Sequence, residues 1–381
     1  MCQHKISQNN SFLLNIVRIT AATFVLAGHS FFTFQKTIFK NHNFFPDLQS
    51  CGVVLFFILA GFFSAYSLSR KQDDVDYTFL SYIIEKLCRL WSGLIPALFF
   101  ITLVDYLSIS LDPIKYRYFS NYNFKNFVGN LFFLQSVFPP AKSDVLQNFP
   151  QFQIQPFGSG RHLWTLAIEW WIYIAVGFIF LVTIRSIKNN DFSFKTLCLT
   201  ILFCLYPLEL LYGKFGVIVD LVFIFILGFI IFYIYPFISN YQKVNTKYPS
   251  ATNLFLLIFF LSLTVLLGRI YRNAFNFYFI LSTALYFLCL LLLGDSSTWK
   301  LTKTTAKFIS FFSSYTYSLY LYHYSILTFI VFYVDFLNRT EMFWATFILS
   351  HAVSILMYFL FERHGKALSI YFINLYRKSH S

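Results

Sequence analysis

Long apolar runs separated by short polar loops dominate the chain. A membrane-spanning helix needs about 20 mostly apolar residues, and such runs recur from one end of the sequence to the other. They predict an all-α, polytopic membrane bundle of about ten transmembrane helices, at residues 12–34, 51–69, 88–110, 163–184, 196–212, 216–236, 251–268, 273–294, 308–334 and 342–361. The first run is too long for the apolar part of a cleavable signal peptide, and it carries Arg18. We therefore expect one membrane domain over residues 1–381.

The charges of the connecting loops predict the orientation. Loops on the side of the two termini carry 17 Lys and Arg residues, against 11 on the other side, 5 of which lie in one long loop. Long loops cross the membrane largely regardless of their charge, so the short loops decide. Both termini are therefore predicted to be cytoplasmic.

The long loop, about residues 111–162, is the one connection with room for structure of its own. Its apolar stretch 125–138 is too short to span a bilayer, so it is either re-entrant or interfacial. The aromatic, Asn-rich stretch 116–124 fits two interpretations: an aromatic belt at the membrane interface or a surface that stacks on sugar rings.

Composition excludes a soluble domain and a nucleic-acid-binding protein. Of all residues, 57% are hydrophobic and only 12% are charged, whereas soluble domains carry about 25% charged residues. The net charge of +13 is spread over the loops rather than gathered in a basic patch, so we expect no nucleic-acid partner. The six cysteines show no metal-ligand spacing, and we expect neither a bound metal nor a disulfide framework.

Ionisable groups inside membrane spans are costly when unpaired, which makes each of them a functional candidate. The candidates inside or near the ends of the spans are Arg18, His29, Asp105, Glu169, His323, His351, Glu209, Asp220, Asp335 and Glu362. At each position a purely structural pairing across the bundle is the competing interpretation.

Helical spacing places some of these groups relative to one another. Arg18 and His29 are 11 residues apart, about 16 Å and close to three turns, so they share one face of the first helix. In the predicted topology, His29 and Glu169 reach similar depths in the outer half of the membrane. A cation near the cytoplasm below an imidazole suits a reaction between a charged cytoplasmic donor and an acceptor on the far side. The imidazole would accept a hydroxyl proton, and a carboxylate would orient it.

Six segments in order resemble the membrane acyltransferase-3 family, whose members transfer acyl groups to cell-envelope glycans. The segments are RITAATFVLAGHS (18–30), GVVLFFILAGFF (52–63), EKLCRLWSGLIPAL (85–98), RHLWTLAIEWWIYI (161–174), SSYTYSLYLYHYSIL (313–327) and FER (361–363). Lys86 departs from the family pattern by standing where the first Arg of an Arg-x-x-Arg pair is usual, and lysine lacks the bidentate geometry of arginine toward phosphate.

The resemblance implies an O-acyltransferase that uses acetyl-CoA or another acyl-CoA as co-substrate, with no permanently bound cofactor. Together with the spacing, it assigns the catalytic role to His29, with Glu169 as its partner and Arg18 on the same helix face. His323 is the alternative base. The donor-binding residues are expected to be Arg18, Lys86 and Arg89, and the acceptor-binding residues Arg161, His162, Trp164 and His323.

The expected acceptor is a hydroxyl of a surface polysaccharide or lipopolysaccharide sugar, free or lipid-linked, and the expected location is the bacterial inner membrane. A transporter or flippase of a lipid-linked glycan or acyl group fits the composition equally well. Transporters, however, favour midplane charges and broken helices in paired repeats, and the sequence shows no such repeat. Acceptor identity, acyl length, oligomeric state and the choice between direct transfer and an acyl-histidine relay stay open.

Overall fold

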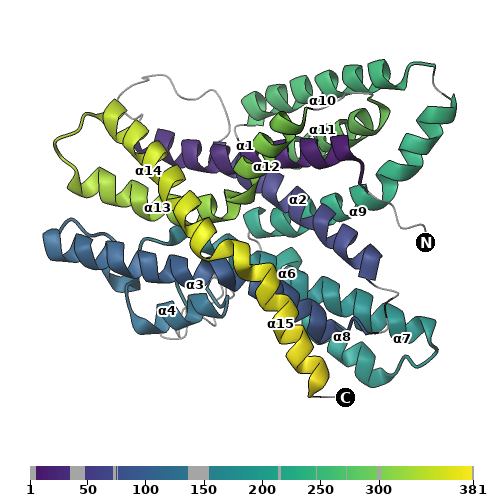
Figure 1. Cartoon of the computed structure of the whole chain (residues 1–381), viewed down its shortest axis with the longest axis horizontal. Coiled ribbons are helices and arrows are strands. Elements are labelled where there is room, and N and C mark those ends of the chain that lie inside the picture. The colour runs from purple at the N-terminus through teal and green to yellow at the C-terminus, as the bar shows by residue number, and fades with distance from the viewer. Residues whose placement is uncertain are drawn as a thin grey trace. The chain divides into compact units, whose positions relative to one another are not determined.

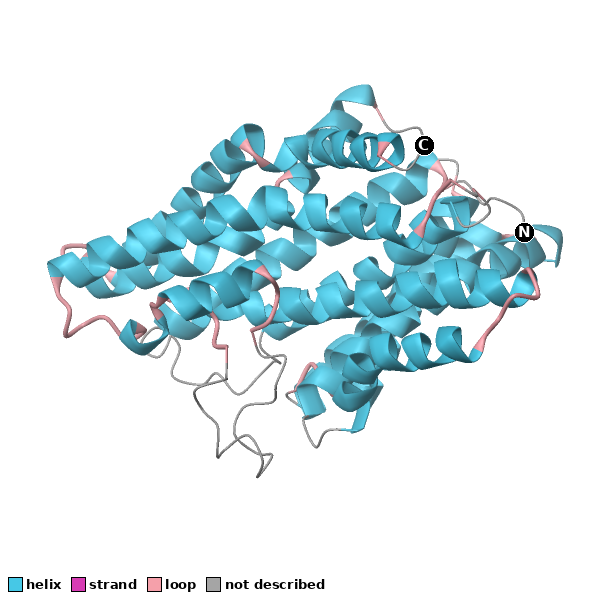
Figure 2. Ribbon diagram, turned by 90° about the horizontal axis from the view of Figure 1, so that it is seen from below, coloured by secondary structure: helices cyan, strands magenta, loops and turns pink. Residues whose placement is uncertain are grey.

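The computed structural model describes residues 6–34, 48–71, 74, 76–135, 154–212, 216–245, 247–271, 273–297 and 302–379. Within these ranges all regular secondary structure is helical, as Figure 2 shows, and the backbone contains no strand. The expected all-α fold is therefore confirmed.

The chain folds into two compact units that alternate along the sequence. Unit 1 comprises Met1–Asp73 and Gly216–Thr316, and unit 2 comprises Asp74–Phe215 and Tyr317–Ser381.

Unit 1 is a bundle of six helices. They are α1 (Gln8–Phe34), α2 (Leu48–Lys71), α9 (Gly216–Asn245), α10 (Pro249–Tyr271), α11 (Phe277–Ser296) and α12 (Lys303–Ser314) (Figure 1). Helices α2 and α9 pack with their backbones in close contact. A Cβ on Gly61 would lie 1.9 Å from the carbonyl oxygen of Phe225, and a Cβ on Gly228 would lie 2.0 Å from that of Ile58. Small residues at such a crossing allow tight packing between membrane helices. This explains Gly61, the second glycine of the segment GVVLFFILAGFF.

Unit 2 contains the long loop and the remaining helices. Its elements are α3 (Phe79–Leu111), η1 (Phe119–Asn121), α4 (Phe124–Leu131), η3 (Arg161–Leu163), α6 (Trp164–Phe178), the π-helical turn η4 (Ile179–Thr183), α7 (Ile184–Lys188), α8 (Phe194–Tyr212), α13 (Thr316–Tyr333), α14 (Arg339–Leu360), η5 (Glu362–His364) and α15 (Gly365–Lys378). Side-chain contacts show that α6 runs antiparallel to α3, because Lys86 contacts Tyr173 and Tyr82 lies against Gly177. They also show that α13 runs parallel to α3, because Tyr317 contacts Leu90 and Tyr322 contacts Phe100.

Helix α4 belongs to the long loop but lies alongside the membrane-spanning helix α3 (Figure 1). Three contacts fix its direction. The Tyr122 hydroxyl donates to the carbonyl of Thr102, the rings of Phe127 and Phe99 are in contact, and the ring of Phe132 meets Trp91. From Thr102 to Trp91 is 11 residues, so the segment from Tyr122 to Phe132, which contains α4, follows α3 for about 16 Å.

The chain turns back at the end of α4, where Phe133 has a φ of 58°. Two indole N–H groups satisfy carbonyls that the helix end exposes. Trp91 Nε1 donates to Leu131 at 2.9 Å, and Trp171 Nε1 donates to Phe133 at 3.0 Å. Gln135 then donates to the carbonyl of Leu163 at the start of α6. Non-helical backbone inside a membrane requires such partners.

The described part of the apolar stretch, up to Gln135, thus packs against the middle of α3, which favours the re-entrant over the interfacial interpretation. Residues 136–138 of the predicted stretch, and residues 136–153 of the long loop, lie outside the described ranges.

The predicted spans coincide with helices, but two of them do not qualify as membrane spans and one boundary is wrong. Among the described residues, eight helices or continuous helical runs are long and apolar enough to cross a membrane. The Tyr-rich α13 is not one of them, and α8, predicted as the span 196–212, counts only as a shorter apolar helix over Phe194–Cys204. The prediction of one helix over 308–334 is wrong, because Tyr315 separates α12 from α13. Hydroxyls near the break bind backbone carbonyls: Ser314 donates to Phe311, and Thr316 donates to Ser313. Such local bonds compete with continuous helix.

Candidate functional site

Three helices of unit 2, α3, α6 and α13, together with η5, bring charged and phenolic groups to one place. We call this group the ionic cluster, and it consists of Lys86, Arg89, Glu169, Tyr173, Tyr317 and Glu362. Its two cations lie one turn apart on α3, and its two carboxylates come from α6 and from η5.

Lys86 is buried and makes two cation–π contacts. Its Nζ lies 4.5 Å from the ring centroid of Tyr173 on α6 and 5.3 Å from that of Tyr82 on α3. Ring quadrupoles stabilise an ammonium group where water is scarce. The cation predicted to bind the donor is therefore seated on aromatic rings at the contact between α3 and α6.

Arg89 lies within the electrostatic reach of both carboxylates, Glu169 and Glu362. Its side chain retains accessible surface although these groups surround it. The planar guanidinium group of arginine suits phosphate oxygens. Arg89 can therefore bind an anionic ligand while it stays close to the two carboxylates. The expected donor-binding pair Lys86 and Arg89 is thus assembled within unit 2.

Glu169 accepts a hydrogen bond from the phenol of Tyr173, one turn later on α6. The half-buried carboxylate is therefore held in one orientation by its own helix. The sequence motif contains this Tyr at the i+4 position, where side chains of a helix meet. Tyr173 is a member of the site that residue-by-residue reasoning did not select, although the spacing Glu-x-x-x-Tyr was a usable signal.

Glu362 closes the start of α13. Its Oε2 accepts bonds from the backbone N–H and the hydroxyl of Ser318. The first N–H groups of a helix lack helical partners and favour a negative charge. The acid of the segment FER therefore stabilises the helix that carries Tyr317 and His323.

A second group of side chains, the imidazole cluster, lies at the start of α6 and further along α13. It consists of His162, Thr165, Tyr320, His323 and Tyr324. The ring centroids of His162 and His323 are 4.9 Å apart, and both histidines are buried. Tyr320 donates from its phenol to the carbonyl of His162 at 2.6 Å and is hydrogen-bonded to the Thr165 hydroxyl.

Backbone carbonyls fix the tautomer of each neutral imidazole. His323 Nδ1 lies 2.8 Å from the carbonyl oxygen of Tyr320, and His162 Nε2 lies 3.2 Å from that of Leu321. Since a carbonyl only accepts, these nitrogens carry the protons. His323 then presents Nε2 as its basic nitrogen, which is the arrangement that a general base requires.

Tyrosines connect the imidazole cluster to the long loop. The hydroxyls of Tyr118 and Tyr324 are 3.4 Å apart, and the guanidinium of Arg161 lies 6.0 Å from the ring centroid of Tyr118. Burial raises the pKa of the Tyr118 phenol, so the group remains a hydrogen-bond donor at neutral pH. The predicted acceptor residue Arg161 is exposed, whereas His162 is buried one residue away. Trp164 is half-buried at the start of α6.

Asp105 has a structural partner in unit 2. Its Oδ2 accepts from the backbone N–H of Ser159 at 2.8 Å, and the Ser159 hydroxyl donates to Ser325 on α13 at 2.7 Å. Gly158 has a φ of 50°, and a Cβ there would lie 2.0 Å from Asp105 Oδ2. Only glycine fits this turn, which fixes the end of the long loop against α3 and α13.

The aromatic stretch 116–124 is partly used inside the protein. Tyr116 is buried, and the ring of Tyr122 stacks on Phe157 with centroids 5.4 Å apart. Phe119 and Phe124, in contrast, are exposed.

The remaining predicted residues lie elsewhere. Arg18 and His29 are half-buried on the uninterrupted helix α1 of unit 1, where the Arg18 guanidinium lies 4.2 Å from the ring centroid of Phe63. His29 belongs to unit 1 and Glu169 to unit 2, and their pairing stays a prediction. His351 packs against Phe347 on α14 and belongs to neither cluster.

The other acidic candidates have simpler placements. Asp335 forms an exposed ion pair with Lys115, with Nζ and Oδ2 3.0 Å apart. Glu209 and Asp220 lie outside the side chains that the structure describes. In the described ranges, no group of three or more His, Cys, Asp or Glu side chains is placed to hold a metal ion.

Comparison with known proteins identifies the family. A family model described as an acyltransferase domain (Acyl_transf_3) matches residues 13–363. Comparison with curated proteins gives no match, and comparison with solved structures gives none either. The match covers nearly the whole chain and includes Arg18, His29, Glu169 and His323, so this multi-pass membrane protein belongs to the acyltransferase-3 family.

Proposed function

We propose that this membrane acyltransferase moves an acetyl group from cytoplasmic acetyl-CoA to a hydroxyl of a cell-surface polysaccharide or lipopolysaccharide sugar, in a bacterial inner membrane. The reaction breaks the C–S bond of the thioester and forms a C–O ester bond. The acceptor hydroxyl loses a proton to an imidazole, and the imidazole returns it to the CoA thiolate.

The observation that carries the proposal is the order of groups within unit 2. Lys86 and Arg89 supply positive charge at one level of α3, and Glu169 lies beside them on α6. The buried histidines 162 and 323 lie about two turns away, His162 just before the start of α6 and His323 further along α13. Anion-binding groups thus lead to basic nitrogens along one set of helices, which supports a reaction between an anionic donor and a hydroxyl acceptor.

His29 is the proposed base, and Glu169 is the carboxylate that orients it and stabilises its charged form. General-base catalysis by a positioned imidazole contributes roughly 10²–10⁴-fold in rate. His323 is the alternative base, because its Nδ1 is held by a backbone carbonyl and its Nε2 is left as the basic nitrogen. Arg18 shares the helix with His29 and is proposed to assist donor binding.

Acceptor binding is proposed for Arg161, His162, Trp164 and the loop above them. Arg161 is exposed where the tyrosine pair 118 and 324 leads to the histidines. Planar guanidinium and indole groups suit the hydroxyls and apolar faces of sugar rings.

The test is mass spectrometry of the surface polysaccharide and lipopolysaccharide. Cells would carry the wild-type gene, no gene, or the Glu169→Gln variant at equal membrane levels. The proposal expects acetylated sugar with the wild-type gene only. A change in the amount of surface glycan without a change in its acetylation would instead indicate transport and would refute the proposal.

A further inference from the structure

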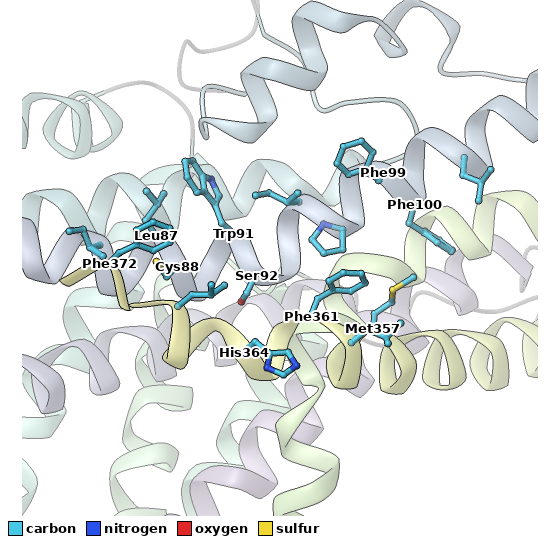
Figure 3. A pocket seen from close by; sticks show the side chains of 16 residues that line it. Leu87, Cys88, Trp91, Ser92, Phe99, Phe100, Met357, Phe361, His364 and Phe372 are labelled. Carbon is cyan, nitrogen blue, oxygen red and sulfur yellow. The ribbon is translucent and has the colours of Figure 1, made fainter. Parts of the chain in front are cut away.

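A long apolar groove lies on unit 2 between α3 and the run formed by α14, η5 and α15 (Figure 3). Its volume is about 1020 Å³, at the upper end of the range for small-molecule sites. Figure 3 shows Leu87, Trp91 and Phe99 of α3 together with Phe361 and Phe372 of the other run among the side chains that line it.

The chemistry of the lining is almost entirely hydrocarbon. Of the 16 lining residues, only five carry a side-chain heteroatom. These residues are Cys88, Trp91, Ser92, His364 and Met357, and the last of them has only a thioether. The indole N–H of Trp91 is engaged with the carbonyl of Leu131. The ligand is therefore a hydrocarbon chain rather than a nucleotide or a sugar.

Helix geometry gives the length of the groove. The lining residues on α3 extend from Ile84 to Leu103, which is 19 residues or about 28 Å. The hydrocarbon core of a bilayer is about 30 Å thick. A phospholipid tail belongs to one leaflet and reaches only about half of that thickness, so one tail cannot fill the groove from end to end.

The groove is built into the fold by a helix break. Between α14 and α15, the short η5 redirects the chain, and Gly365 lets the start of α15 approach α3 closely. A Cβ on Gly365 would lie 2.6 Å from the hydroxyl oxygen of Ser92. The helices touch at this crossing and leave apolar side chains of both flanks exposed, among them Phe99, Leu360 and Phe372.

The groove also lies beside the proposed site. Phe361 lines it, and the next residue, Glu362, belongs to the ionic cluster. Likewise Cys88 lines the groove while Arg89 belongs to the cluster. A lipid held in the groove therefore contacts the same two segments that carry Arg89 and Glu362 of the ionic cluster.

We propose that this groove binds the polyisoprenoid chain of a membrane-anchored sugar acceptor. The inference rests on the proposed function, whose acceptor it specifies as lipid-linked. A polyisoprenoid is long enough to occupy the full length of the groove, and its headgroup end carries the sugar. Binding the chain along α3 raises the local concentration of the sugar at the site, since the second contact becomes intramolecular.

The test uses the full-length protein in phosphatidylcholine vesicles with a photoreactive polyprenyl phosphate and without any acyl donor. The expected result is labelling of peptides from residues 84–103 and 357–372. Unlabelled polyprenyl phosphate should compete, whereas added phospholipid should not. Because no acyl transfer is measured, a failure of the proposed function would leave this result unchanged.

Matched tryptophan substitutions locate the binding site. Leu360 lines the groove and Leu356 does not, yet both lie on α14 with 53% and 54% exposure. Leu360→Trp should lower labelling roughly tenfold, the effect of overfilling a packed site, and Leu356→Trp should leave it unchanged. Leu103→Trp and Leu107→Trp on α3 form a second pair. Equal labelling in both members of each pair, or equal competition by phospholipid, would overturn the proposal and show a groove filled by bulk lipid only.

Discussion

The phenol of Tyr173 donates a hydrogen bond to the carboxylate of Glu169, one turn earlier on α6. The same ring supports the ammonium group of Lys86, whose Nζ lies 4.5 Å from its centroid. One tyrosine thus contacts both an expected catalytic group and an expected donor-binding group.

Removing that phenol provides the first prediction. Tyr173→Phe keeps the aromatic ring beside Lys86 but removes the hydrogen bond that the phenol donates to Glu169. Bonds to charged groups contribute about 1.5–3 kcal/mol, so we expect kcat to fall roughly tenfold or more with little change in donor KM. The rate would be measured in proteoliposomes with labelled acetyl-CoA. Tyr241→Phe, at an exposed position of α9, is the control, and an unchanged kcat in Tyr173→Phe would contradict the role.

The donor site is tested at Arg89. Arg89→Ala should raise the KM for acyl-CoA roughly tenfold, since a charge-assisted contact to phosphate is lost. Arg89→Lys should recover part of that loss because it retains the charge but not the planar fork. Arg339→Ala, on the exposed first turn of α14, should have no effect. A raised KM for the sugar with an unchanged KM for acyl-CoA would move Arg89 to the acceptor site.

Arg161 gives the converse prediction for the acceptor. Arg161→Ala should raise the KM for the sugar several-fold and leave donor KM alone, because the exposed guanidinium lies at the loop end of the tyrosine pair. Lys115→Ala in the same loop breaks only the exposed ion pair with Asp335, which contributes little. Equal effects of the two substitutions would indicate a general surface-charge effect instead.

The re-entrant helix predicts an effect on stability. Trp171→Phe removes the N–H that satisfies the carbonyl of Phe133 at the tip. An unsatisfied carbonyl in apolar surroundings costs about 1–3 kcal/mol, so thermal unfolding of the purified protein should begin at a lower temperature. The exposed Trp344 of α14 is the matched control as Trp344→Phe. Equal unfolding temperatures for wild type and Trp171→Phe would show that the bond contributes nothing.

The sequence predicted the helices well because each apolar run has to satisfy its own backbone in a membrane. It did not predict the break at Tyr315, where hydroxyls of neighbouring residues divert hydrogen bonds that a hydropathy pattern does not record. Nor did it decide between a re-entrant and an interfacial course for the residues from Lys125. That choice depends on Trp91 and Trp171, whose indoles meet the helix end from distant parts of the chain.

The candidate site was likewise predicted in part from the sequence. Charge and spacing, together with the family resemblance, selected Lys86, Arg89, Glu169 and His323, which the structure places in two clusters. The sequence does not single out Tyr320 and Tyr324, because tyrosines are common throughout the chain and the roles of these two follow only from their three-dimensional partners. Two of the acidic candidates, Asp105 and Glu362, receive backbone N–H groups and hold the loop and α13 in place.

The central claim is that an imidazole of this chain takes the proton of the acceptor hydroxyl, and the most direct measurement compares His29→Ala, Glu169→Gln and His323→Ala. Each variant would be reconstituted at equal amount, with CoA binding checked and acetyl transfer to the sugar followed with labelled acetyl-CoA. The account predicts that His29→Ala abolishes transfer, that Glu169→Gln is strongly impaired, and that His323→Ala keeps partial activity, all with CoA binding intact. Full transfer by His29→Ala with complete loss in His323→Ala would contradict the assignment of His29, and full transfer in all three variants would contradict imidazole catalysis altogether.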